Sequence, residues 1–303
     1  MTIPLIYQLN LVLYIYIFSH MDSAFSQKQA THQNRLAKDE SSDRLSSWKK
    51  RWGEDKIGWH ENEIHDSLKQ FGHILVPNFS LEAGESMRVD SSCNSSGIDR
   101  ETSVRVFVPL CGKSVDLAFL AKQKGVLEVV GVDGIRKALE EFQSNNPTLE
   151  IGEDLERVES HAKKFDRFRG KKITLLKGDY FDLDIDSIGG ELFDSIWDRA
   201  SLVAIQPNLR KEYIEVLSGI IKPGGTILLS TLNRKEGDEK ARKAGPPFSV
   251  DEAEVRRLYE GLDWVESVEN LNETDELNER FKSEGLTSVV GLTFVIQVKK
   301  TSS

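Results

Sequence analysis

Two features of the sequence, twenty-one residues apart, form the clearest candidate ligand site. The first is the turn Pro109-Leu-Cys-Gly-Lys-Ser114, whose Gly112 lets a ligand approach the backbone closely. The second is Asp133, which ends the next apolar run. A carboxylate at this spacing can accept hydrogen bonds from both hydroxyls of a ribose, and we favour this interpretation over a helix N-cap.

The turn lacks the glycines that a phosphate-binding loop requires. A dinucleotide fold needs GxGxxG at this point, and a nucleotide-triphosphate loop needs a glycine where Phe107 stands. Lys113 is therefore as consistent with a solvated helix start as with a ligand contact. The predicted ligand is a nucleoside without phosphates.

Two later turns carry further polar groups. Asp179 and Tyr180 offer a carboxylate for an exocyclic amine and a ring that can stack on adenine. Asp198 and Arg199 form either a charge pair at the cleft or a structural ion pair. Together these groups predict S-adenosylmethionine as the cofactor.

An alternation of strands and helices must position these turns. The predicted strands span residues 104–108, 127–132, 173–176, 192–197 and 226–231. The predicted helices span residues 114–124 and 135–143, and another follows Pro207. Charged residues dominate 150–171, which predicts a surface insertion. Ligands of such sheets bind beyond the carboxyl ends of the strands, where all four turns lie.

The C-terminal part of the sequence does not continue this alternation of strands and helices. A helix near 250–260 precedes two apolar segments, 264–269 and 289–298, separated by the polar stretch 270–285. This spacing leaves no room for a crossover helix, so we expect an antiparallel finish. The predicted fold is α/β, a doubly wound, mostly parallel seven-stranded sheet with an antiparallel last strand.

The N-terminal part predicts an extension, residues 1–43, before a single domain at 44–300. Its apolar run 3–18 is short for a membrane span, and a chain starting at Met21 would lack it, so a targeting segment and an absent segment both stay open. Short helices are expected near 46–52 and 64–71, followed by a polar loop at 85–103.

Composition narrows the partners. The formal charge of −9 and pI near 5.3 argue against nucleic-acid binding, which depends on Lys and Arg. Two cysteines in unrelated contexts and six scattered histidines give no metal-binding pattern, so we expect no metal and a reducing compartment. We expect a cytoplasmic protein, with no membrane partner, that is a monomer.

Several ordered motifs resemble the thiopurine S-methyltransferase family, a group of class I methyltransferases with a Rossmann-like fold. The resemblance covers residues 46–299. The motifs are Trp48-Lys-Lys-Arg-Trp-Gly-Glu-Asp-Lys-Ile-Gly-Trp-His60, Val106-Phe-Val-Pro-Leu-Cys-Gly-Lys-Ser114, Val129-Val-Gly-Val-Asp133, Ile196-Trp-Asp-Arg199 with Leu202-Val-Ala-Ile205, and Gly245-Pro-Pro-Phe248.

The resemblance implies roles for individual residues. It places Trp48, Leu110, Asp133, Asp179, Tyr180 and Arg199 around S-adenosylmethionine. It places Trp59 and Arg280 at the acceptor, with the N-terminal helix as a lid that excludes water; core packing is the alternative for the tryptophans. The segment Leu232-Asn-Arg-Lys-Glu-Gly-Asp-Glu-Lys-Ala-Arg-Lys-Ala244 is longer and more charged than in the family, and a solvated surface loop is the favoured interpretation.

The implied reaction is methyl transfer to the sulfur, or selenium, of a small aromatic or heterocyclic thiol. Such a displacement needs alignment more than a strong base, so no catalytic base is named. Arg199, Arg280 and Asp198 are the candidates for stabilising the thiolate. The alternatives are a halide or general thiol methyltransferase and a non-catalytic module that binds the cofactor.

Overall fold

The computed structural model describes residues 45–82, 103–153 and 165–301. The chain divides into two compact units, Met1–Glu54 and Asp55–Ser303. In the first unit residues 45–53 are helical, which confirms the predicted short helix. The predicted extension 1–43, its apolar run 3–18 and the predicted loop 85–103 lie outside the described residues, apart from Ser103.

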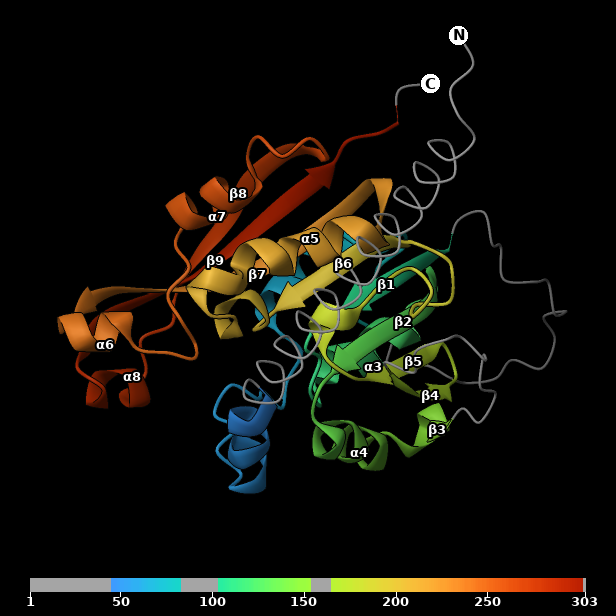
Figure 1. Ribbon diagram of the computed structural model, residues 1–303, viewed down its shortest axis with the longest axis horizontal. Helices are drawn as coiled ribbons and strands as arrows, with labels where there is room; N and C mark the ends of the chain where they lie inside the picture. Colours follow the sequence, from blue (N-terminus) through green and yellow to red (C-terminus); the bar gives the residue numbers. More distant parts are fainter. Residues whose placement is uncertain (1–44, 83–102, 154–164, 302–303) are drawn as a thin grey trace, which may run out of the picture. The chain divides into compact units, whose positions relative to one another are not determined.

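A single sheet forms the centre of the second unit (Figure 1). Its parallel strands, in spatial order, are β5 (Ile173–Lys177), β2 (Val126–Asp133), β1 (Val104–Val108), β6 (Phe193–Arg199) and β7 (Ile221–Gly237). Beyond β7 lie β9 (Leu286–Val298), antiparallel to β7, and β8 (Val265–Asp275), antiparallel to β9. The strand order reverses at β1, and the doubly wound, mostly parallel fold with an antiparallel last strand is confirmed.

The described residues form nine strands rather than seven, because two strands extend the edge beside β5. They are β3 (Gly152–Glu153) and β4 (Asp166–Gly170), and β4 runs antiparallel to β5. Phe168 of β4 is buried between the more exposed Arg167 and Arg169. The charged residues concealed this period-2 pattern, so the prediction of a surface insertion over 150–171 was wrong where the structure describes it.

Helices cover both faces of the sheet. One face packs against α2 (Asp66–Phe71), α3 (Val115–Lys122) and α4 (Arg136–Asn145), and the other against α5 (Arg210–Ile220) and α7 (Glu252–Tyr259). Val106 and Val108 of β1 face the first group, whereas Phe107 faces the second, as strand alternation requires. Short 3₁₀ turns, η1 to η5, span Gly72–Ile74, Pro147–Leu149, Tyr180–Asp182, Leu202–Ala204 and Pro207–Leu209.

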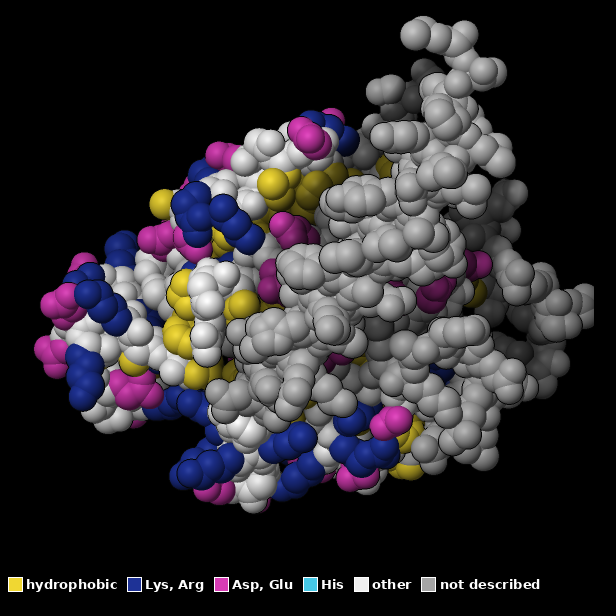
Figure 2. Space-filling model, in the orientation of Figure 1, with side chains coloured by type: hydrophobic (Ala, Val, Ile, Leu, Met, Phe, Trp, Pro, Cys, Tyr) yellow, Lys and Arg dark blue, Asp and Glu magenta, His cyan; other side chains and the backbone are white. Residues whose placement is uncertain are grey.

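The far ends of β7 and β9 carry two more short helices, α6 (Glu239–Lys243) and α8 (Glu279–Ser283) (Figure 1). Ala241, Phe281 and Val289 form a small separate core there. The segment 232–244 is therefore a strand end and a helix with a buried side, not the solvated loop that its charges predicted. Figure 2 shows charged side chains of both signs on the outside of this end.

Within the described ranges, no helix combines the length and apolar character that a membrane span requires.

Candidate active site

The carboxyl ends of four neighbouring parallel strands bring the predicted cofactor residues to one edge of the sheet. Asp179 follows β5, Asp133 ends β2, Leu110 follows β1 and Arg199 ends β6. The backbone N–H of Gly178 donates to the carbonyl of Asp133 at 3.1 Å, which joins the first two ends. Asp133 and Arg199 are two strands apart, roughly 10 Å at the usual spacing between strands.

The first turn folds back over the end of β2. Leu110 and Gly112 both adopt positive φ, 42° and 54°, and the N–H of Cys111 donates to the carbonyl of Val132 at 2.9 Å. A Cβ at Gly131 would lie 2.8 Å from Cys111 Sγ, so only glycine lets the turn approach this closely. A leucine in the left-handed region is strained, and such strain clusters at binding sites.

Asp133 is buried beneath this turn. Its carboxylate accepts hydrogen bonds from the N–H of Gly112 at 2.9 Å and of Ile135 at 2.8 Å. The cap residue of α4 is Ile135, so Asp133 is not the helix N-cap. Burial raises the pKa of Asp133 to about 6, and the two backbone donors oppose this shift. A carboxylate has about four acceptor positions, so two stay available for the hydroxyls of a ribose.

The third turn differs from the prediction. The Asp179 carboxylate accepts the N–H of Phe181 at 3.1 Å and is half-buried, as a ligand-facing group can be. Tyr180 is 2% exposed; its ring stacks on Tyr213 at 4.5 Å, and its hydroxyl donates to the Tyr213 carbonyl. The ring therefore belongs to the core, and the predicted adenine-stacking role for Tyr180 is corrected.

Asp198 and Arg199 do not pair with each other, because neighbouring residues on a strand face opposite sides. Asp198 is fully buried and accepts the hydroxyl of Tyr213 at 2.8 Å. Burial raises its pKa to about 6, and the Tyr213 hydroxyl opposes the shift. Asp198 is thus inaccessible to a ligand, which overturns its candidacy for thiolate stabilisation, whereas Arg199 forms an ion pair with Glu61.

Asp116 fixes the segment that carries Glu61, and sequence reasoning missed both residues. The buried Asp116 carboxylate accepts the Trp197 Nε1–H at 2.9 Å and the backbone N–H of His65 at 3.0 Å. Burial raises the pKa of Asp116, and the bond from Trp197 opposes the shift. The only sequence signal was an acid in the first turn of a helix, which is common in any helix.

The two residues predicted for the acceptor side come close together. The half-buried Trp59 follows Gly58, and a Cβ at Gly58 would lie 2.8 Å from Arg280 Nη1. Arg280, on α8, therefore lies against the backbone beside Trp59. In the first unit, the guanidinium of Arg51 lies 5.6 Å from the ring centre of Trp48. The cofactor role of Trp48 stays a prediction.

Comparisons with known proteins identify the family of this chain. A family model described as thiopurine S-methyltransferase matches residues 92–299. The chain belongs to the thiopurine S-methyltransferase family. The thiopurine S-methyltransferase of Nitrosospira multiformis is 32% identical over 255 residues, which cover 83% of this chain and 97% of the relative. That of Pseudomonas paraeruginosa is 32% identical and covers 82% and 97%, and that of Bos taurus is 30% identical and covers 84% and 90%.

Membership of the thiopurine S-methyltransferase family confirms the predicted enzyme class: the chain is a methyltransferase that uses S-adenosylmethionine. The residues at the sheet edge fit this cofactor. Asp133 retains acceptor positions for a ribose, Asp179 adds a second carboxylate, and the turn after β1 has no glycine-rich phosphate loop.

Proposed function

We propose that this methyltransferase transfers a methyl group to the sulfur, or selenium, of a small aromatic or heterocyclic thiol. One observation carries the proposal: a single short segment links two arginines that come from separate elements. Gly58 lies against Arg280 of α8, and Glu61 pairs with Arg199 of β6. Trp59 stands between these contacts in the sequence, so an aromatic side chain accompanies two cations that can attract a thiolate.

The cofactor half of the site follows the edge of the sheet. We assign both ribose hydroxyls to Asp133, backbone contacts to Leu110 and Gly112, and a polar contact to Asp179. Arg199 contributes a cation at the opposite side of this edge. Tyr180 contributes through its backbone alone, and the cofactor role of Trp48 stays a prediction.

S-Adenosylmethionine, when bound, supplies a methyl group on a positively charged sulfur. The protein's part is alignment of the acceptor and exclusion of water, which together can contribute several kcal/mol, roughly 7–11 for well-oriented reactants. Arg199 and Arg280 lower the pKa of a nearby thiol, because a positive charge favours the thiolate. No general base is required, since aromatic thiols ionise near neutral pH.

The function is tested by turnover on defined acceptors. The full chain is incubated with S-adenosylmethionine and a panel of thiols that includes 6-mercaptopurine, and S-adenosylhomocysteine is followed. We expect turnover with aromatic thiols and little with iodide. Cofactor binding without methylation of any acceptor would refute the enzyme and favour the non-catalytic module, whereas preference for iodide would favour a halide methyltransferase.

We also propose that the protein is a cytoplasmic monomer that does not act on nucleic acid. The formal charge of −9 supports the absence of a nucleic-acid substrate, because phosphate-rich partners are repelled by excess carboxylates. Light scattering during size-exclusion chromatography tests the monomer, and cell fractionation tests the compartment. A stable dimer would contradict the monomeric state, and a membrane-bound pool would contradict the cytoplasmic location.

A further inference from the structure

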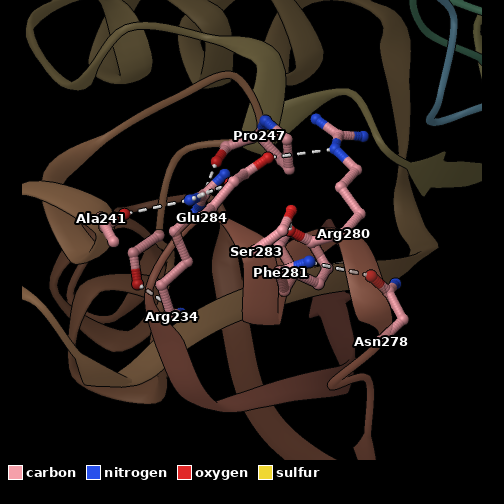
Figure 3. Close-up of polar contacts among 9 residues, drawn as sticks. Arg234, Ala241, Pro247, Asn278, Arg280, Phe281, Ser283 and Glu284 are labelled. Atoms are coloured by element: carbon pink, nitrogen blue, oxygen red, sulfur yellow. Dashed lines mark hydrogen bonds and ion pairs between the residues drawn. The ribbon is translucent and has the colours of Figure 1, made fainter.

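We propose that Arg234 and Glu284 are positioning residues that set where Arg280 meets the acceptor. This inference rests on the proposed function, since it assigns to Arg280 the acceptor side of the thiol site. It also gives a role to the charged segment 232–244, which supplies Arg234. Figure 3 shows the three side chains converging from β7 and the α8 end of the chain.

Arg234 is a buried guanidinium with fixed partners. It is 3% exposed, and it donates from Nε to the carbonyl of Pro247 at 3.1 Å and from Nη1 to that of Ala241 at 3.0 Å. Its guanidinium lies 5.3 Å from the ring centre of Phe281. A buried charge needs a counterion as well as neutral acceptors, and Glu284 Oε2 provides it at 2.9 Å from Nη1.

Glu284 is shared between two arginines. While Oε2 binds the buried Arg234, Oε1 accepts the Nε–H of Arg280 at 3.1 Å. Figure 3 shows that the two terminal nitrogens of Arg280 point away from Glu284. An isolated i,i+4 pair at the surface orients its members weakly. Here Arg234 has already fixed the carboxylate, so Arg280 is oriented with less loss of side-chain entropy.

Gly58 sets the limit on the other side. A Cβ there would lie 2.8 Å from Nη1 of Arg280, closer than a real Cβ atom tolerates. The φ angle of Gly58 is not positive, so its backbone conformation is compatible with alanine. A methyl group at Gly58 would therefore displace the end of the Arg280 side chain, which lies between Glu284 and the backbone next to Trp59.

The test separates positioning from stability. Glu284→Gln and Gly58→Ala are each expected to raise the KM for 6-mercaptopurine about fivefold, with kcat and cofactor affinity within about twofold. Arg234→Lys should raise KM similarly and add nothing in an E284Q background, because it acts through Glu284. Glu279→Gln is the matched control: it lies on the same helix and pairs with Lys282 at 2.8 Å, so KM should not change.

Two outcomes overturn the proposal. If E284Q and G58A leave the KM for 6-mercaptopurine unchanged, whatever their thermal stability, the contacts of Arg234 and Glu284 serve only the stability of the fold. If the two variants weaken the binding of S-adenosylmethionine as much as they raise the KM for the thiol, Arg280 contacts the cofactor rather than the acceptor. If the wild-type protein methylates no thiol, the proposed function fails, yet the positioning is still measured by the Arg280 Nε–H signal in ¹⁵N NMR. That signal should shift in E284Q and G58A and not in E279Q; no shift would refute the positioning itself.

Discussion

Arg199 and Glu61 form an ion pair at the carboxyl end of β6, where the proposed function places the cofactor beside the acceptor. The Arg199 side chain is 13% exposed and that of Glu61 is 50% exposed, so the carboxylate is the member that a ligand can displace. Burial raises the pKa of Glu61, and Arg199 opposes this shift. The charge of Arg199 is therefore compensated before an acceptor arrives, which reduces its attraction for anionic acceptors.

Glu61→Gln should shift the acceptor preference toward anions. Removal of the carboxylate frees Arg199, so kcat/KM for 2-mercaptobenzoate should rise roughly fivefold relative to thiophenol, about 1 kcal/mol. Steady-state kinetics with both thiols measure this ratio. Glu63→Gln is the control, because the Glu63 side chain is 88% exposed and faces Lys69. Equal changes for the two acceptors would contradict the expectation.

Asp133 should make cofactor affinity depend on pH. Its pKa is raised to about 6, so the neutral carboxyl accumulates as the pH falls through 6 and loses an acceptor position for a hydroxyl. Affinity for S-adenosylmethionine should be constant above pH 7 and about tenfold lower at pH 5. Asp133→Asn should bind roughly 30-fold more weakly and show no such dependence.

Calorimetric titration from pH 5 to 8 measures both effects. Arg280→Ala serves as the contrast, because it should change acceptor turnover while cofactor affinity stays nearly intact. Parallel pH profiles of the wild type and Asp133→Asn would show that another group controls binding. Loss of cofactor binding in R280A would refute the division of roles.

The sequence correctly predicted that Asp133, Asp179 and Arg199 lie at one edge of the sheet, because parallel strands place their carboxyl ends together whatever the details of packing. Their positions followed from the strand ends alone, whereas their cofactor contacts stay a proposal. The predicted pairing of Asp198 with Arg199 was wrong, because residues that alternate along β6 face opposite sides of the sheet. The 3₁₀ turn after β5 directs Tyr180 inward, and turns of this kind leave no periodic signal.

Arg234 and Glu61 could not be recognised from local sequence. Arg234 stands in a charged run that is typical of solvated surface, and its burial depends on Glu284, fifty residues later. Glu61 is one of several acids near Trp59, and only the fold brings Arg199 of β6 beside it. Pairings between distant segments depend on tertiary packing, which residue spacing does not encode.

Asp198→Asn tests the cost of a buried carboxylate. The folded pKa is about 6 and the usual value is 3.8, so the folded state binds the proton more tightly. The contribution of Asp198 to the free energy of unfolding is therefore greatest at low pH and is lost as the pH rises through 6. Between pH 7.5 and 5 the wild type should gain about 1 kcal/mol relative to D198N.

Urea denaturation at several pH values measures this difference. The comparison isolates Asp198, because every other titrating group, Asp133 included, is common to both proteins. A constant difference across the range would mean that Asp198 stays ionised in the folded state, with the Tyr213 hydroxyl sufficient to offset its burial.

Gly131→Ala should disturb the first turn and the cofactor site together. The added Cβ would meet Cys111 Sγ and Leu117 Cδ2, both at 2.8 Å, inside a closely packed core. Overpacking of this kind costs about 1–3 kcal/mol and should move the turn that carries Leu110 and Gly112. We therefore expect lower unfolding free energy and weaker binding of S-adenosylmethionine.

Gly219→Ala is the matched substitution, since an added Cβ at this exposed position of α5 meets nothing within 4 Å. Gly219 lies in the last turn of α5, where alanine should stabilise the protein by at most about 0.5 kcal/mol, without changing cofactor affinity. Chemical denaturation and calorimetric titration of both variants provide the comparison. If G131A were to lose stability and keep full cofactor affinity, the turn after β1 would not be part of the cofactor site.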